Sequence, residues 1–212
     1  MFEKSVEELT ELGAQITTAE IAQQPELWRD TLNIYRENKE AIEAFLTEAR
    51  AMGEGRLSVV FTGAGTSDYV GDTCAPYLRH AGNTDLYDFK PIATTDIVSA
   101  PRDFLRAEDP TLVVSFARSG NSPESLAAVA VAKELVHNVK FLNITCAPEG
   151  KLAVESADDP NALTLLIPRA NDKGFAMTGS YTCMTLLSTL IFDEASDEQK
   201  AEWVETIAKM GE

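Results

Sequence analysis

Apolar residues between positions 20 and 50 recur at helical spacing. From Trp28 onward they follow one another at steps of three, four or seven residues, which places them on one face of a helix. Pro25 suits the first turn of one long helix, because that position needs no amide hydrogen. Thr17 and Glu20 have the spacing of a capping box at an earlier helix start. We therefore predict a helical N-terminal segment whose apolar stripe packs on a core, the stripe being Trp28, Leu32, Tyr35, Ile42, Phe45, Leu46 and Ala49.

After residue 56 the pattern changes to short apolar runs that alternate with helical stretches. Near-continuous Val, Ile, Leu and Phe runs with crossover helices between them are typical of a parallel sheet covered on both faces. Because crossovers are right-handed almost without exception, we predict an α/β fold with a doubly wound, flavodoxin-like, five-stranded parallel sheet. The predicted strands are 57–63, 85–89, 111–117, 139–145 and 162–168, and the predicted helices are 66–80, 95–105, 122–137, 149–156, 179–194 and 197–210.

Glycine and hydroxyl residues follow the first predicted strand, in the sequence GAGTS. Gly63 and Gly65 let the backbone turn tightly, and Thr66 and Ser67 bring hydroxyls beside the unpaired amides of a helix start. Such a helix start attracts anions. The loop also resembles a dinucleotide fingerprint, but Asp68 stands where its third glycine belongs. A structural turn with a helix cap explains this loop equally well when it is taken alone.

A second loop, SFARSGNSPES, follows the predicted strand at 111–117 and runs into a helix. Ser122 is well placed as its N-cap, Pro123 fits its first turn, and Glu124 is a first-turn acid. These structural roles fully explain the three residues. They leave the preceding part of the loop without an explanation.

That preceding part is Arg118, Ser119, Gly120 and Asn121. A guanidinium, hydroxyls and a glycine amide at one helix start form a site for a compact dianion such as a phosphate monoester. Two converging hydroxyl loops suit a single phosphate, whereas a dinucleotide needs only one such loop. The chain has no Walker A lysine motif, so nucleoside triphosphate hydrolysis is disfavoured.

The charge balance narrows the choice of partners. The 212 residues include 18 Lys and Arg against 34 Asp and Glu, a formal net charge of −16, so nucleic-acid binding is disfavoured. Most of the excess acids lie in residues 1–55 and 193–212, which leaves the middle nearly neutral and compatible with an anionic substrate. No apolar run approaches the roughly 18 residues of a membrane span. The acidic first residues are also wrong for a signal peptide, so we expect a cytoplasmic protein.

Cysteine and histidine usage argues against metal chemistry. Cys74, Cys146 and Cys183 form no CxxC pair and are predicted to be buried free thiols. His80 and His137 are not paired at metal-ligand spacing. The sequence therefore predicts no metal site and no cofactor.

The two loops together resemble those of sugar isomerase (SIS) domains. GAGTS at 63–67 and SFARSGNSPES at 115–125 match that family's two phosphosugar loops in order and spacing. EIAQQPELWRDTL at 20–32 is similar to the segment before the isomerase half of glucosamine-6-phosphate synthase. With LNITC at 142–146 and NDKGFAMTGSYT at 171–182, the chain looks most like tagatose-6-phosphate ketose/aldose isomerases and galactosamine-6-phosphate deaminases. The resemblance covers almost the whole chain.

The resemblance implies a phosphosugar site built from both loops. Ser67 would bind the phosphate from the first loop, and Ser119 and Ser122 fall on the family's hydroxyl positions in the second. Residues near 174–180 would line the sugar end. The implied site residues, of which the last two are the weaker candidates, are Gly65, Thr66, Ser67, Arg118, Ser119, Gly120, Asn121, Ser122, Thr178 and Ser180.

The resemblance also implies a division of the chain and a partner. Enzymes of this subgroup carry two SIS domains in tandem, and the sequence matches only the first. We expect a helical segment at 1–55 that packs on a SIS domain at 56–194, with 195–212 as a last helix or a connector to a second SIS domain. Because the N-terminal apolar stripe exceeds what one sheet face needs, we also expect a homodimer or a partner with a second SIS domain.

The implied activity is that of an aldose–ketose isomerase or deaminase acting on galactosamine 6-phosphate or tagatose 6-phosphate. This reaction needs a positioned base, which in related enzymes lies mostly in the second domain, so we expect this chain alone to bind phosphosugar but to turn it over poorly. Glu124 is the acid beside the loops, although a helix-start role explains it as well. The alternatives are a non-catalytic phosphosugar sensor and a dinucleotide-dependent oxidoreductase, the latter disfavoured by Asp68 and by the second loop.

Overall fold

Five parallel strands form the centre of the computed structural model, which describes residues 2–212. Their order across the sheet is β2-β1-β3-β4-β5, which confirms the predicted flavodoxin-like arrangement. Four of the predicted strands start where the sequence pattern places them. The strands are β1 (Leu57–Gly63), β2 (Tyr87–Pro91), β3 (Thr111–Ala117), β4 (Val139–Thr145) and β5 (Ala162–Leu166).

Strand β2 begins two residues later than predicted, because a turn precedes it. The side-chain oxygen of Asn83 accepts hydrogen bonds from the backbone amides of Asp85 (3.2 Å) and Leu86 (3.1 Å). Such a turn takes these two residues out of the extended backbone. The apolar run in the sequence does not reveal it.

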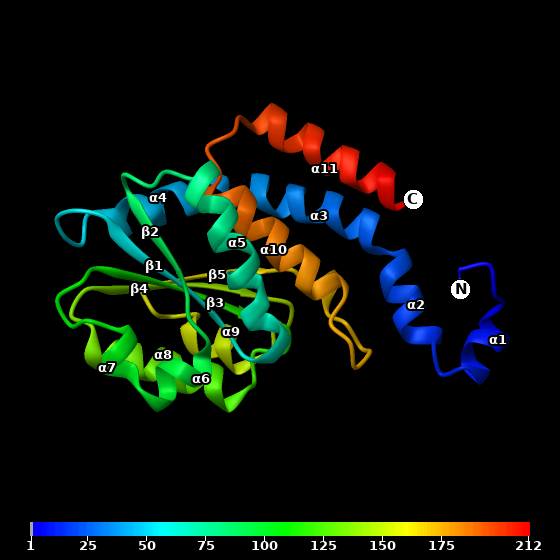
Figure 1. Cartoon of the computed structure of the whole chain (residues 1–212), viewed down its shortest axis with the longest axis horizontal. Helices are drawn as coiled ribbons and strands as arrows, with labels where there is room; N and C mark the ends of the chain where they lie inside the picture. The colour runs from blue at the N-terminus through cyan, green and yellow to red at the C-terminus, as the bar shows by residue number, and fades with distance from the viewer. Residues whose placement is uncertain (1) are drawn as a thin grey trace.

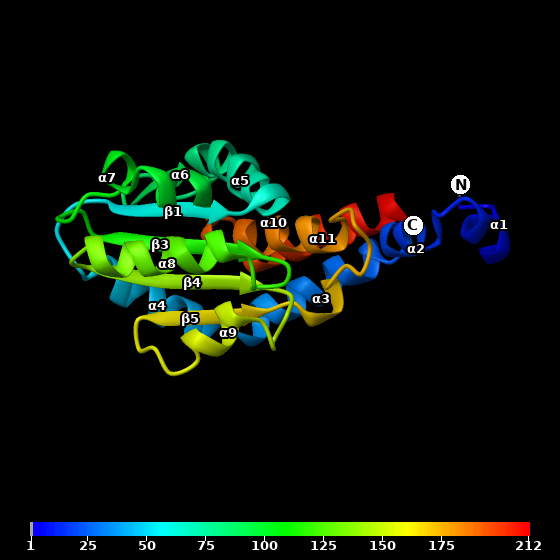
Figure 2. The same ribbon diagram turned by 90° about the horizontal axis from the view of Figure 1, so that it is seen from below.

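Helices cover both faces of the sheet, as the doubly wound fold requires (Figures 1 and 2). Because side chains alternate along each strand, the two faces carry two separate apolar clusters. One face is covered by α3 (Gln24–Glu37), α4 (Lys39–Arg50), α5 (Asp68–Ala81) and α10 (Gly179–Phe192), with α11 (Asp197–Gly211) packed on α3. The other face is covered by α6 (Thr94–Ser99), α7 (Pro101–Phe104), α8 (Pro123–Leu135) and α9 (Lys151–Ser156).

The predicted long N-terminal helix is in fact two helices, α3 and α4, separated at Asn38. The Asn38 backbone leaves the helical region at φ −102° and ψ 4°, and its side-chain amide donates to the Ile34 carbonyl (2.8 Å). The apolar spacing continues across this break, which is why the sequence pattern reads as one helix. Most of the predicted stripe is buried all the same, from Leu32 to Ala49.

The predicted capping box at Thr17 and Glu20 is wrong. Both residues lie inside α2 (Gln15–Ala22), whose N-cap is Ala14. A capping box does occur earlier, at α1 (Val6–Glu11), where Ser5 and Glu8 exchange hydrogen bonds with each other's backbone amides. Helices α1 and α2 extend past the carboxyl ends of the strands, away from the rest of the sheet (Figures 1 and 2).

The apolar stripe is covered by the chain itself. Tyr35 and Ile42 are buried in the cluster that joins α3 and α4 to the strands and to α10. Trp28, at the end of the stripe, is partly buried, and its indole N–H donates to the Thr182 hydroxyl on α10 (2.9 Å). The stripe is therefore not an uncovered apolar surface that would favour self-association.

Helix α11 is tied to α3 by charged groups. The Arg29 guanidinium contacts the carboxylates of Glu205 (2.8 Å) and Glu212 (2.6 Å), and Lys39 pairs with Asp197 at the start of α11. A bilayer-spanning helix, which must be both long and apolar, is not found within residues 2–212.

Candidate functional site

The two glycine-rich loops leave neighbouring strands at the same edge of the sheet. Gly63 of β1 lies opposite Phe116 of β3, so the loops that follow these strands begin side by side. The chain passes from β1 to β2 on one side and then to β3 on the other, so the strand order reverses at this point. Open parallel sheets bind ligands in the crevice outside such a switch point.

The first loop depends on two glycines. Gly65 has φ +59°, a conformation that favours glycine. A Cβ on Gly63 would lie 2.4 Å from the carbonyl carbon of Ser67, so only glycine lets the loop fold back here. The Thr94 hydroxyl, at the start of α6, donates to the Gly63 carbonyl (2.9 Å) and so ties the loop to α6. Thr66 is exposed at the edge of the sheet.

The second loop rests on the start of α9. Gly120 has φ +66° and is buried, and a Cβ there would lie 3.3 Å from the Cβ of Leu152. The Gly120 carbonyl accepts from the Leu152 amide (3.0 Å), and the Asn121 side-chain oxygen accepts from the Lys151 amide (3.0 Å). The side-chain oxygen of Asn121 is therefore occupied in holding α9. Ser119, in contrast, is exposed, and its hydroxyl oxygen accepts only a long bond from the Asn121 amide (3.4 Å).

Ser122 holds the predicted N-cap position of α8 but makes a different bond. Its backbone is extended, as an N-cap requires. Its hydroxyl contacts the Ser125 hydroxyl (2.7 Å) and no backbone amide of the helix. The predicted position is confirmed and the predicted capping hydrogen bond is wrong. Glu124 lies in the first turn of α8 and is exposed.

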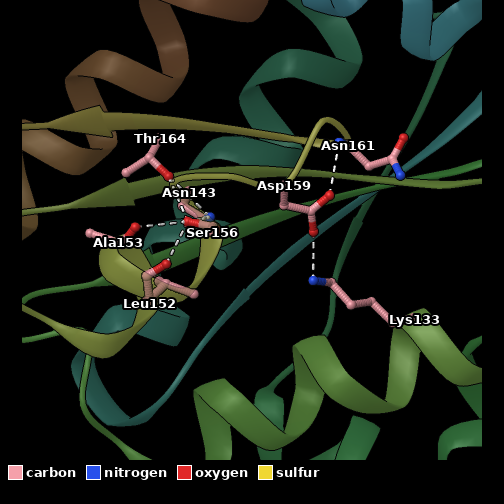
Figure 3. A network of polar contacts seen from close by, with 8 residues as sticks. All are labelled: Lys133, Asn143, Leu152, Ala153, Ser156, Asp159, Asn161 and Thr164. Carbon is pink, nitrogen blue, oxygen red and sulfur yellow. Dashed lines mark hydrogen bonds and ion pairs between the residues drawn. The ribbon is translucent and has the colours of Figure 1, made fainter.

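A polar network joins α9 to the sheet (Figure 3). The Asn143 amide, on β4, donates to the hydroxyls of Ser156 on α9 (3.0 Å) and Thr164 on β5 (3.3 Å). Beside this network Lys133 of α8 pairs with Asp159 (2.6 Å), and Figure 3 shows this ion pair next to the turn that leads to β5. These contacts hold the helix on which Gly120 and Asn121 rest.

A third segment, residues 171–178, reaches both loops from the stretch between η2 (Pro168–Ala170) and α10. The Arg118 guanidinium donates through Nη1 to the Gly174 carbonyl (3.1 Å). The Ser67 hydroxyl lies 3.9 Å from the Met177 sulfur, close enough for a weak hydrogen bond. Ser67 and Arg118, predicted from separate motifs, are therefore brought to one segment that neither motif contains.

The hydroxyls of Thr178 and Ser180 both donate to a carboxylate that the sequence pattern does not reveal. Asp172 accepts hydrogen bonds from the backbone amides of Thr178, Gly179 and Ser180 and from the hydroxyls of Thr178 and Ser180. Ser180 is completely buried. The start of α10 thus already holds an anion, and these two weaker candidates do not offer free hydroxyls to a ligand. An acid six residues before the N-cap residue Thr178 is outside the usual capping spacing, so only the fold identifies it.

Acidic groups gather beside the first loop. Asp68, directly after Ser67, has its pKa raised by burial and, in addition, by the nearby carboxylates of Asp72 and Asp96.

His137 is exposed next to Glu108 (3.4 Å) and precedes β4 at the opposite end of the strands, away from both loops.

The cysteines are buried free thiols, as predicted. Burial is the main cause that raises the pKa of Cys74 and of Cys183 to about 11, so both stay protonated at neutral pH. Within residues 2–212 no cluster of three or more His, Cys, Asp and Glu side chains is placed to hold a metal ion.

Known proteins match this arrangement in sequence and in fold. The SIS domain family matches residues 55–192. The D-galactosamine-6-phosphate deaminase AgaS of Shewanella sp. (strain ANA-3) is 44% identical over 189 residues, which cover 89% of this chain and 48% of that protein. This chain spans about half the length of the curated relatives that it matches.

Solved structures of similar proteins share this fold. A protein of Clostridium novyi NT superposes with a TM-score of 0.90 at 41% identity, covering 99% of this chain and 52% of that one. The tagatose-6-phosphate ketose/aldose isomerase of Escherichia coli superposes with a TM-score of 0.81 at 35% identity, covering 90% of this chain and 50% of the isomerase.

Proposed function

Because this chain belongs to the SIS domain family, we propose that its two glycine-rich loops bind the phosphate of a sugar phosphate. The observation that carries the proposal is the meeting of both loops at the switch point between β1 and β3. Ser67 and Thr66 supply hydroxyls from one loop, and Ser119 and Arg118 supply a hydroxyl and a guanidinium from the other. Charge-assisted hydrogen bonds of this kind suit a phosphate dianion.

We further propose that the sugar is a hexosamine or ketohexose, with galactosamine 6-phosphate and tagatose 6-phosphate as the first candidates. The relatives support this choice, since they are a galactosamine-6-phosphate deaminase and a tagatose-6-phosphate ketose/aldose isomerase. The chain would then contribute to an isomerase or deaminase, a reaction that moves protons between neighbouring carbons and needs a positioned base. A cytoplasmic location, and a homodimer or a second SIS domain as partner, remain predictions from the sequence.

The test of the proposed function is calorimetric titration with galactosamine 6-phosphate, tagatose 6-phosphate, inorganic phosphate and NAD. We expect the sugar phosphates to bind and NAD not to bind. Ser119→Ala should weaken sugar-phosphate binding by about ten- to a hundredfold, because a hydrogen bond to a charged group contributes about 1.5–3 kcal/mol. Its melting temperature should stay at the parent value, because the Ser119 side chain is exposed.

Ser99→Ala, which removes an exposed hydroxyl at the end of α6, is the matched control and should bind like the parent. NAD binding in place of sugar-phosphate binding would favour the oxidoreductase alternative. Unchanged binding by Ser119→Ala would remove the second loop from the site. Turnover of the bound sugar phosphate, followed by ammonia release and by sugar analysis, separates an enzyme from a sensor.

A further inference from the structure

Glu20, on the N-terminal helix α2, contacts the segment that links the two loops. We propose that Glu20 is a positioning residue that holds the Arg118 guanidinium in place for the phosphate, acting through Gly174. The proposal rests on the proposed function, because Arg118 belongs to the second loop. Glu20 itself touches neither loop in the structure and is not assigned any contact with the substrate.

The Glu20 carboxylate is inside the protein, although it belongs to a helix at the end of the molecule. The residue is 7% exposed. Its Oε1 atom accepts hydrogen bonds from the backbone amides of Lys173 (2.6 Å) and Gly174 (3.0 Å). A buried carboxylate is costly unless such bonds compensate it. The two amides therefore tie the middle of segment 171–178 to α2.

Gly174 is held on both sides. Its amide donates to Glu20, and its carbonyl accepts from Nη1 of Arg118 (3.1 Å). A Cβ at this position would lie 2.7 Å from Oε2 of Glu20, so this carboxylate packs directly against Gly174. The result is a continuous chain of polar contacts from α2 through Gly174 to the second loop.

Arg118 benefits from this chain because a guanidinium has five N–H donors. The bond to Gly174 uses one nitrogen and fixes the direction of the planar group, and the other donors stay available to an anion. A long side chain fixed before the ligand arrives binds more tightly, because less conformational entropy is lost on binding. If Gly174 moves, the guanidinium loses its anchor.

The contact of Glu20 is separate from the one that orders the rest of the segment. Asp172 binds the amides at the start of α10 and fixes the end of the segment at Thr178. Glu20 fixes the middle, where Arg118 is bound. Removing Glu20 should therefore release Gly174 and Arg118 while leaving the fold and the start of α10 in place.

The experiment compares Glu20→Ala, Glu20→Gln and Arg118→Ala in the full chain, by titration with galactosamine 6-phosphate and by thermal melting. Glu20→Ala should weaken binding about tenfold, since it removes the oxygen that accepts from both amides. Glu20→Gln should stay within about threefold of the parent, because its carbonyl oxygen still accepts from both amides. Glu11→Ala removes an exposed acid from α1 and is the charge-matched control, with parent-like binding expected.

The double variant Glu20→Ala/Arg118→Ala decides whether Glu20 acts through Arg118. We expect it to bind no more weakly than Arg118→Ala alone, which is the signature of two residues acting as one unit. Additive losses would overturn the proposal, and so would Glu20→Ala binding like the parent.

Hydrogen exchange of the ligand-free protein gives a readout that does not depend on sugar binding. The Gly174 amide should exchange faster in Glu20→Ala, and it should keep the parent rate in Glu20→Gln and Glu11→Ala. Equal rates in all variants would overturn the contact itself. A parent that binds no sugar phosphate but shows the expected exchange pattern would overturn the proposed function and leave the contact between Glu20 and Gly174 intact.

Discussion

Asp68, beside the first loop, carries a negative charge that lowers the stability of the folded protein. Partial burial raises the pKa of the Asp68 carboxyl above its ordinary value of 3.8. The nearby carboxylates of Asp72 and Asp96 raise it further. A carboxyl whose pKa is higher in the folded state than in the unfolded state destabilises the folded protein less when it is protonated. Its ionised form therefore lowers the stability of the folded protein at every pH above the folded-state pKa.

We accordingly expect Asp68→Asn to raise the melting temperature at pH 7, because the neutral amide avoids both the burial penalty and the repulsion. The gain should shrink as the pH falls through the raised pKa of Asp68 toward 3.8, since the parent carboxyl then becomes neutral as well. Asp158→Asn, at an exposed turn, is the control and should show no such pH-dependent gain. A gain that stays constant from pH 7 down to pH 3 would contradict this explanation.

At the residue scale, the sequence predicts the features that depend only on neighbouring residues in the chain. The glycines of both loops and the position of Ser122 before α8 follow from local turn and cap chemistry. Glu20 and Asp172 were missed because their partners depend on the fold. Glu20 binds amides about 150 residues away. The bond between Ser122 and Ser125 was also missed, because two hydroxyls one turn apart compete with the expected cap.

Among the elements, α10 has the most unusual start. Its first amides donate to Asp172, which is 6% exposed and lies six residues before Thr178. The free amides of a helix start need partners. A carboxylate also interacts favourably with the helix dipole there. One side chain thus provides what a capping residue and a bound anion would otherwise provide.

Replacing this carboxylate should destabilise the protein strongly. Asp172→Ala should lower the free energy of unfolding by about 2–4 kcal/mol, since it removes a cap and leaves buried amides and hydroxyls without partners. Denaturant unfolding measures this as a lower midpoint at an unchanged slope. Lys173→Ala, which truncates the exposed neighbouring side chain, should keep the parent midpoint. If Asp172→Ala unfolds at the parent midpoint too, water or the hydroxyls themselves satisfy the helix start.

At the element scale, strands are predicted better than helix ends. The buried strands β1, β3 and β4 are near-continuous apolar runs because both of their faces are covered. The start of β2 was displaced by the turn at Asn83, and the break at Asn38 was hidden by apolar spacing that continues across it. Both errors come from side chains of asparagine bonding to nearby backbone, which hydrophobic patterns do not record.

Across the whole molecule, helices α3 and α4 share one core with the sheet. Residues of α3 and α4 belong to the same buried cluster as β1, β3, β4 and α10, and α11 joins it through Val204. The sequence places boundaries near residues 55 and 195, yet this cluster extends across both positions. The parts on either side of these boundaries should therefore unfold together.

We expect a single cooperative unfolding transition. The two tryptophans, Trp28 on α3 and Trp203 on α11, report from outside the sheet, whereas far-ultraviolet circular dichroism reports on all helices and strands. The two signals should change at the same denaturant concentration. Ile42→Ala on α4 and Leu142→Ala on β4 each remove a buried side chain. Each should lower the free energy of unfolding by about 2–5 kcal/mol and shift both signals together. A fluorescence change that precedes the change in circular dichroism, and that only Ile42→Ala advances, would show that α3 and α4 unfold separately from the sheet.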